Sequence, residues 1–334
     1  MEEKRVWVDG CYDLTHFGHA NMLRQAKSLG TKLIVGVHSD EDIRRVKRPP
    51  VYSLSERVKM VKAIKWTDEV VEAAPYKTTI DTLNQYNCDI AVHGDDKTTE
   101  NGEDTYNAVK VAERYAEVPR TAGISTTGII KRILSRYSAE PLHSDSVISQ
   151  YTGTSPFLQT TRKIYEFVKD NAKHPKSTDR IVYVTGMFDL LHVGHLDFLE
   201  KARSLGDYLI VGLHSDNPSS ATRSILTSNE RMMNLLSYKC VDEVLTEAPR
   251  KITDDLMEHF NISMVYHGRF ADSIREFDPY EVPKRMNRFG NIESGSGVTT
   301  ETIIERIRQH NEKYRAANAL KEEIELKYQI PVMV

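Results

Sequence analysis

The chain has 334 residues, 45 Lys and Arg against 48 Asp and Glu, and a formal net charge of −3. Its length and its 40% hydrophobic content predict about two globular domains. The acidic balance argues against a nucleic-acid-binding protein held by a broad basic surface, and it leaves room for a local basic pocket that binds a phosphorylated small molecule.

The cysteine spacing, the N-terminal residues and the length of the apolar runs together indicate the cellular compartment of the protein. The three cysteines, Cys11, Cys88 and Cys240, are widely spaced and form no disulfide framework or metal knuckle, so a reducing compartment fits best. Residues 1–10 enter a strand pattern without a signal peptide, and no apolar run could span a bilayer. We therefore expect a cytoplasmic protein without a transmembrane segment.

Strands and helices alternate along the first part of the chain. We predict strands at 5–10, 32–40, 68–75 and 88–94, and helices at 19–30, 53–65 and 78–87. Gly30 is expected to end the first of these helices and Ser55 to cap the second. This alternation, with continuous apolar runs such as KLIVGV, predicts a doubly wound α/β domain with a parallel sheet. Ligands of such domains lie beyond the carboxyl ends of the strands.

The whole pattern is written twice. AKSLGTKLIVGVHSD (26–40) returns as ARSLGDYLIVGLHSD (202–216), and GISTTGIIKRI (123–133) returns as GVTTETIIERI (297–307). We therefore predict two tandem Rossmann-like domains. The expected parts are a first domain at 1–138, a linker with one helix at 139–178, a second domain at 179–310 and a solvated helical tail at 311–334.

The string GCYDLTHFGH places two histidines where the first strand turns into a helix. Unpaired N–H groups and the positive helix dipole make this an anion site, and Gly18 lets the backbone approach a ligand. His16 and His19 share one face of the first turn and could donate to a polyphosphate. Two other interpretations are a pair of surface histidines and metal ligation. The second lacks a third ligand at zinc spacing nearby.

With HFGH, RTAGISTTGIIKRI (120–133) and VHGDD (92–96), the first copy resembles the cytidylyltransferase family of nucleotidyltransferases. The tandem layout and the string KRPPVYSLSER resemble the members that act on phosphoethanolamine. The resemblance implies that CMP passes from CTP to phosphoethanolamine, giving CDP-ethanolamine and pyrophosphate for phosphatidylethanolamine synthesis. It also implies Mg²⁺ with CTP, small-molecule substrates and no nucleic-acid partner.

The resemblance also implies roles for residues that match its motifs. The expected catalytic residues are His16, His19, Lys47 and Arg120. The expected nucleotide-binding residues are Gly10, Cys11, Tyr12, Gly18, Arg57, His93, Gly94, Asp95, Gly123, Ile124, Ser125, Thr126 and Thr127. Asp13 and Tyr76 are expected beside the phosphoryl substrate, and no residue is assigned as a metal ligand. Taken singly, Lys47 could be a loop lysine, Arg57 a surface pair and Asp95 a turn cap.

The second copy keeps one half of this set. His192 and His195 repeat the histidine pair, but Arg120 aligns with Ser294 and Asp95 with Arg269. No lysine replaces Lys47. Because one lost phosphate contact commonly costs about 10²–10³ in rate, we predict one active site, in the first copy. The second would be an inactive partner or a remnant nucleotide-binding module.

Other readings remain open at this point. Tyr12, Trp66 and Tyr76 could contribute to an aromatic cage for phosphocholine. A non-catalytic nucleotide sensor, an adenylyltransferase and an aminoacyl-tRNA synthetase with its HIGH string are the further alternatives. The tandem layout is compatible with a homodimer or with pairing of the two repeats within one chain.

Overall fold

The computed structural model describes residues 3–96, 98–100, 102–137, 158, 160–169, 173–215, 224–268 and 277–327. The chain forms two compact units. One unit comprises Met1–Gln159 together with Glu301–Val334, and the other comprises Thr160–Thr300. None of the helices within the described ranges is both long and apolar enough to cross a bilayer.

The first unit contains a five-stranded sheet in which every neighbouring pair of strands is parallel. Its order is β3-β2-β1-β4-β7. The strands are β1 (Arg5–Gly10), β2 (Lys32–His38), β3 (Glu69–Ala74), β4 (Ile90–Gly94) and β7 (Tyr115–Val118). The order reverses between β1 and β4, and a crevice at such a switch point is the usual ligand site of this fold. The predicted doubly wound parallel sheet is confirmed.

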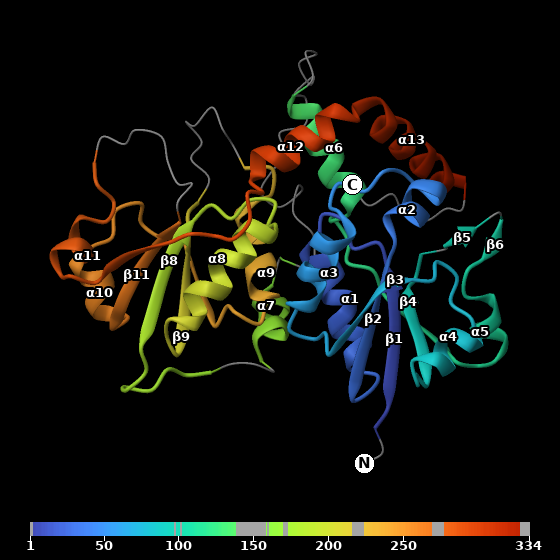
Figure 1. Ribbon diagram of the computed structural model, residues 1–334, viewed down its shortest axis with the longest axis horizontal. Coiled ribbons are helices and arrows are strands. Elements are labelled where there is room, and N and C mark those ends of the chain that lie inside the picture. Colours follow the sequence, from blue (N-terminus) through green and yellow to red (C-terminus); the bar gives the residue numbers. More distant parts are fainter. Residues whose placement is uncertain are drawn as a thin grey trace. The chain divides into compact units, whose positions relative to one another are not determined.

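Helices cover both faces of this sheet. The helices are α1 (Phe17–Lys27), α2 (Asp40–Val46), α3 (Leu54–Lys62), α4 (Ile80–Gln85), α5 (Asn107–Val111) and α6 (Thr126–Arg136), and β5 (Thr99–Glu100) pairs with β6 (Glu103–Asp104) in a hairpin. Figure 1 shows α1 and α3 on one side of the strands and α4 and α5 on the other. Trp7 and Ile34 of the sheet pack with Leu83 of α4 and Val109 of α5 in one buried cluster.

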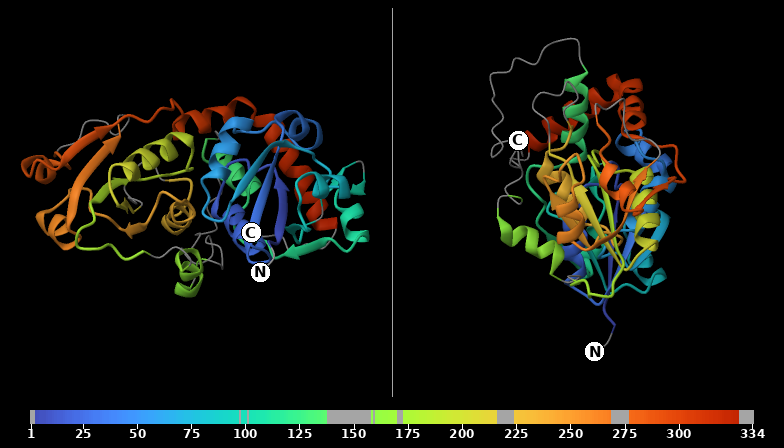
Figure 2. Two further views of the ribbon diagram at one scale, coloured as in Figure 1. Left: turned by 60° about the horizontal axis from the view of Figure 1, so that its bottom comes forward. Right: turned by 90° about the vertical axis from the view of Figure 1, so that its left-hand side faces the viewer.

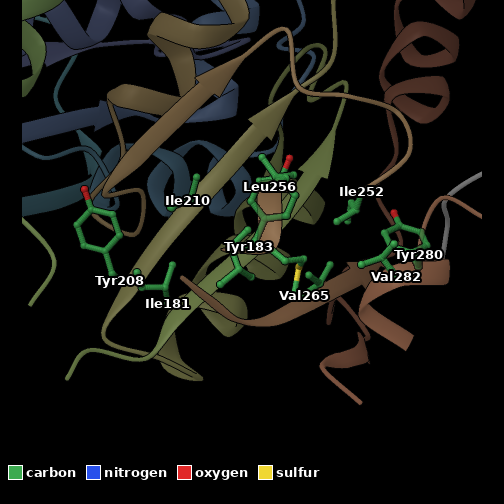
Figure 3. Close-up of a cluster of buried hydrophobic side chains, with 11 residues drawn as sticks. Ile181, Tyr183, Tyr208, Ile210, Ile252, Leu256, Val265, Tyr280 and Val282 are labelled. Atoms are coloured by element: carbon green, nitrogen blue, oxygen red, sulfur yellow. The ribbon is translucent and has the colours of Figure 1, made fainter. Parts of the chain in front are cut away.

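The second unit repeats the same topology. Its strands are β8 (Ile181–Gly186), β9 (Tyr208–Leu213), β10 (Glu243–Thr246), β11 (Ile262–Gly268) and β12 (Phe289–Ile292), in the order β10-β9-β8-β11-β12. Its helices are α7 (Thr161–Val168), α8 (Val193–Ser204), α9 (Ser228–Leu236), α10 (Asp254–His259) and α11 (Glu281–Arg285). Figure 3 shows its core, where Tyr183 and Ile210 of the strands pack with Leu256 of α10. The predicted second α/β domain is therefore confirmed.

The last two helices return to the first unit. Helices α12 (Thr300–Gln309) and α13 (Asn311–Lys327) follow the second repeat in sequence, but residues from Glu301 onward group with the first sheet. Helix α13 packs beside α6, as Figures 1 and 2 show. Residues 311–327 of the expected tail form α13. The helix is not solvated on every side, because Tyr314 and Asn318 are buried against the first unit.

The structure also bears on three local predictions, for the cap of α3, for Gly30 and for the linker helix. Ser53, not Ser55, caps α3, because its hydroxyl accepts the N–H of Glu56 while the Glu56 carboxylate accepts the N–H of Ser53. Gly30 does not take the left-handed conformation. It is needed there because a Cβ would lie 2.6 Å from the carbonyl oxygen of Lys4. Helix α7 lies within residues 139–178, where one linker helix was expected, and much of that segment lies outside the described residues.

Candidate active site

The turn after β1 is sharply folded. Tyr12 and Leu14 both have positive φ angles, 51° and 47°, which side chains other than glycine rarely adopt. The Thr15 hydroxyl donates to the carbonyl of Tyr12 at 2.8 Å and holds the turn closed. This fold places His16 as the N-cap of α1 at the carboxyl edge of the sheet.

His16 and His19 lie face to face at the start of α1. Their rings stack with centroids 3.9 Å apart and planes 25° apart. Nδ1 of His16 accepts the N–H of Gly18 at 3.2 Å, so Nε2 is the nitrogen left for a ligand. Nε2 of His16 is buried and has no hydrogen-bond partner among the described residues. A buried polar atom of this kind is normally satisfied, which indicates a bound group at this position.

Helix α6 begins beside this pair. A Cβ on Gly18 would lie 2.8 Å from Cγ2 of Ile124, so glycine allows the GISTT loop to pack against the start of α1. Ser125 caps α6 through the N–H of Gly128, and Thr126 donates to the carbonyl of Asp13 at 2.9 Å. Two helix N-termini therefore face one place, which favours an anion there.

Arg120 is placed by the HGDD string at the end of β4. Its N–H donates to Asp95 at 3.1 Å, and its guanidinium lies 3.6 Å from Asp96. A Cβ on Gly94 would lie 3.1 Å from Cγ of Arg120, so glycine permits this close approach. Asp95 thus holds the backbone of Arg120. His93 lies 3.9 Å from Asp96 and bonds the carbonyl of its neighbour Gly94.

Lys47 reaches the same edge from the end of α2. Its Nζ lies 3.8 Å from Sγ of Cys11 and 5.9 Å from the ring centre of Tyr76. The Tyr12 ring lies 5.6 Å from the His19 ring. Lys47, Cys11, Tyr12 and Tyr76 were all predicted to belong to the site, and the fold brings them to one end of the sheet.

The electrostatics of this edge follow from its burial and its cations. Burial, together with the charges of Arg120 and Lys47, lowers the pKa of His19 to about 3. Burial also lowers the pKa of His16 well below its usual value. Burial alone would raise the pKa of Asp96, but the charge of Arg120 lowers it, so this carboxylate stays ionised. Without a ligand the site therefore holds neutral imidazoles among cations.

Two predicted contacts are already occupied within the protein. Asp13 accepts the N–H groups of Val51 and Tyr52 and pairs with Arg48 at 2.8 Å, so it holds the 48–52 loop. Arg57 is fully buried, and the partners of its guanidinium are the carbonyls of Tyr52, Cys11 and His38 and the carboxylate of Asp40. Both side chains position strand ends and loops around the site. In this arrangement the polar atoms of both side chains are engaged with protein groups rather than directed to a ligand.

The second repeat keeps the histidine geometry. His192 and His195 stack with the same 3.9 Å and 25° as the first pair. Ser294 stands in place of Arg120 and donates to the carbonyl of Ser296 at 2.8 Å. Arg269, expected in place of Asp95, and most of the segment facing Lys47 lie outside the described residues.

Sequence reasoning missed several residues that shape this site. Asp96 was quoted within HGDD without a role, although it pairs with Arg120. Arg48 was quoted within the string KRPPVYSLSER without a role, and its ion pair with Asp13, 35 residues away in the sequence, had no local signal. Lys321 lies beside Thr127, and no local pattern could have joined positions so far apart in the chain.

Comparisons with known proteins give one consistent result. The model of the family described as Cytidylyltransferase-like matches residues 7–132 and 183–295. Ethanolamine-phosphate cytidylyltransferase of Mus musculus is 42% identical over 367 residues, covering 97% of this chain and 90% of the mouse protein. The protein of the same name from Arabidopsis thaliana is 42% identical, covering 97% of this chain and 85% of the plant protein. Choline-phosphate cytidylyltransferase A of Rattus norvegicus is also 42% identical, but covers 40% of this chain and 37% of the rat protein.

Proposed function

The chain belongs to the cytidylyltransferase-like family, and on this premise we propose that it transfers CMP from CTP to phosphoethanolamine, releasing CDP-ethanolamine and pyrophosphate. The observation that carries this proposal is the convergence of His16, His19, Lys47 and Arg120 on the switch-point edge of the first sheet, beside the N-terminus of α6. The relative named for phosphoethanolamine aligns over both repeats, whereas the relative named for phosphocholine aligns over about one repeat. This difference supports phosphoethanolamine as the substrate.

The reaction is an in-line displacement at the α-phosphorus. A phosphate oxygen of phosphoethanolamine forms a bond to that phosphorus, and the bond to the bridging oxygen of the leaving pyrophosphate breaks. No covalent enzyme intermediate is needed, so the protein contributes orientation and neutralisation of charge. His16 and His19, neutral before binding, would donate N–H groups to phosphate oxygens.

The cations divide this work by position. Lys47, next to Tyr76 at the end of β3, would bind the α-phosphate and the attacking phosphate. Arg120, at the end of β4, would exchange Asp96 for the β- and γ-phosphates. The capped N-terminus of α6 would add backbone N–H donors to the same phosphates.

Mg²⁺ would enter this site with the nucleotide. Mg²⁺ is usually bound through one or two carboxylates and substrate phosphates. The ionised carboxylate of Asp96 offers oxygen ligands of the kind that Mg²⁺ prefers. When bound, the ion would neutralise charge that develops on the leaving pyrophosphate. We also propose that the reaction takes place in the reducing cytoplasm, where the thiols of Cys11, Cys88 and Cys240 would stay reduced.

Product formation tests the proposal directly. The full chain is incubated with CTP, Mg²⁺ and, in separate tubes, phosphoethanolamine, phosphocholine or glycerol 3-phosphate, and the products are resolved by mass. We expect CDP-ethanolamine to form far faster than either other product. Preference for phosphocholine would retain the reaction and overturn the substrate. No CDP product from any acceptor would overturn the reaction and favour a nucleotide sensor.

A further inference from the structure

Helix α13 presents one defined face to the first unit. Tyr314, Asn318 and Lys321 are spaced four and three residues apart and therefore share one side of the helix. The Tyr314 ring is 1% exposed and lies 5.2 Å from the guanidinium carbon of Arg48. Nδ2 of Asn318 lies 3.4 Å from the carbonyl oxygen of Thr127. These contacts fix the register of α13 against the first unit.

The third residue of this face, Lys321, lies at the phosphate-binding edge. Its Nζ is 3.5 Å from Oγ1 of Thr127, in the first turn of α6. Cations are disfavoured at a helix N-terminus, because the dipole there is already positive. The carboxylate of Asp96 lies within electrostatic reach of this ammonium, because Lys321 lowers its pKa, and the phosphates of a nucleotide would add further negative charge at the same position.

The charges around His19 lead to the same position. Burial lowers the pKa of the His19 imidazole most, the charges of Arg120, Lys47 and Lys321 lower it further, and the carboxylate of Asp96 raises it, so three cations and one carboxylate lie within electrostatic reach of one ring. The chain as a whole carries a net charge of −3, which makes this local concentration of positive charge informative. Nε2 of His16, in the same place, is buried without a partner among the described residues. Together these groups form a site for a polyanion.

We propose that Lys321 binds the phosphate groups of the nucleotide held by the first repeat. A side chain that follows the second repeat in sequence thus completes the site of the first. This inference rests on the proposed function, since CTP is the polyanion that function supplies. It adds Lys321 to the nucleotide-binding residues. It also means that the second repeat connects the first sheet to α13, the helix that carries Lys321.

Equilibrium binding tests this assignment without requiring turnover. CTP, pyrophosphate and cytidine are titrated calorimetrically into the full-length wild type, Lys321→Ala, Lys321→Arg and Lys313→Ala. Lys313 is an exposed lysine of the same helix and serves as the matched control. We expect Lys321→Ala to weaken CTP and pyrophosphate roughly tenfold, as loss of one charge-assisted contact should. Cytidine should bind all four proteins equally, and Lys321→Arg should recover most of the loss.

Two results would overturn the assignment. One is unchanged affinity of Lys321→Ala for CTP and pyrophosphate. The other is equal weakening of CTP and cytidine, which would mean that the variant merely disturbs the fold, a point that thermal unfolding of each variant checks. If the wild type makes no CDP-ethanolamine but Lys321→Ala still loses phosphate affinity, the proposed function fails and Lys321 remains a phosphate-binding residue.

Discussion

The two repeats share their histidines but not their cations. The rings of His16 and His19 stack in the same way as those of His192 and His195. The turn before each pair has the same positive φ angles, at Tyr12 and Leu14 and at Phe188 and Leu190. The geometry of the histidine pair therefore follows from the turn and the helix cap, and we predict that the pair alone is not sufficient for an active site. What separates the repeats is the set of charges that surrounds the pair.

One buried arginine is also shared by the two repeats, in contrast to Arg120. Arg57 and Arg231 are both fully buried, and each donates to backbone carbonyls at the ends of the strands. This arginine therefore has the same structural role in both repeats. The contact that the Arg120 guanidinium makes among the described residues is its ion pair with Asp96, and Ser294 occupies the corresponding position in the second repeat.

The largest predicted difference between the repeats concerns the histidines themselves. His19→Ala should lower kcat by about 10²–10³, because one donor to a charged phosphate in a water-poor site is lost. His195→Ala, the matched change in the second repeat, should leave kcat near the wild-type value. Steady-state rates of CDP-ethanolamine formation measure both. Comparable losses from the two variants would mean that both repeats are catalytic.

Exchanging the residues at positions 120 and 294 tests whether the arginine accounts for the difference in activity between the repeats. Arg120→Ser writes the second repeat's residue into the first and should lower kcat/KM for CTP by about 10², since a charged phosphate contact disappears. The reverse change, Ser294→Arg, should not create a second active site, because no lysine stands in place of Lys47. The idea fails if Arg120→Ser retains full activity with normal folding.

The buried carboxylates after β1 and β8 offer a comparison in stability. Asp13 pairs with Arg48, whereas burial raises the pKa of Asp189, which accepts the N–H groups of Ile225 and Leu226. Asp13→Asn should lower the free energy of unfolding by about 3 kcal/mol, because it leaves the largely buried guanidinium of Arg48 without its carboxylate partner. Asp189→Asn should lower the free energy of unfolding by roughly 1–2 kcal/mol, because the hydrogen bonds from backbone N–H groups become weaker.

Urea unfolding followed by circular dichroism gives these free energies. A larger loss for Asp189→Asn than for Asp13→Asn would remove Arg48 as the cause of the difference.

The smallest effect concerns helix α12. Arg306 makes two hydrogen bonds to Glu56, at 2.7 and 2.9 Å. Burial would raise the pKa of Glu56, but the hydrogen bonds from Arg306 lower it below its usual value. The pair therefore contributes stability above the unfolded pKa, near 4.5, and loses it as the pH falls through the folded pKa.

Arg306→Ala should consequently cost about 1 kcal/mol at pH 7 and much less at pH 3. Arg308, an exposed neighbour on α12 paired with Glu305, provides the control. Melting curves of the wild type, Arg306→Ala and Arg308→Ala at both pH values make the measurement. An Arg306→Ala deficit that does not shrink at low pH would assign the effect to packing.

Much of this architecture could be predicted from the sequence because its signals are local. Apolar runs predicted β1, β2, β3 and β4 within about two residues, and the helix expected at 19–30 corresponds to α1 at Phe17–Lys27, with His16 as its N-cap. The occupied state of Asp13 and Arg57 could not be predicted, since hydrogen-bond partners depend on which loops fold back. The return of α12 and α13 to the first unit depends on side chains such as Tyr314 meeting residues more than a whole repeat away.

That return has a consequence for how the protein is made. Domains generally fold as units during synthesis, beginning with the N-terminal one. Here the first unit includes Glu301–Val334, so the ribosome must translate the entire second repeat before the first can acquire its final two helices. A nascent chain arrested after residue 300 would carry a folded first sheet with the surface meant for α13 exposed. The contribution that we propose for Lys321 would be made only after residues beyond 300 leave the exit tunnel, which ties full phosphate affinity of the first repeat to completion of the second.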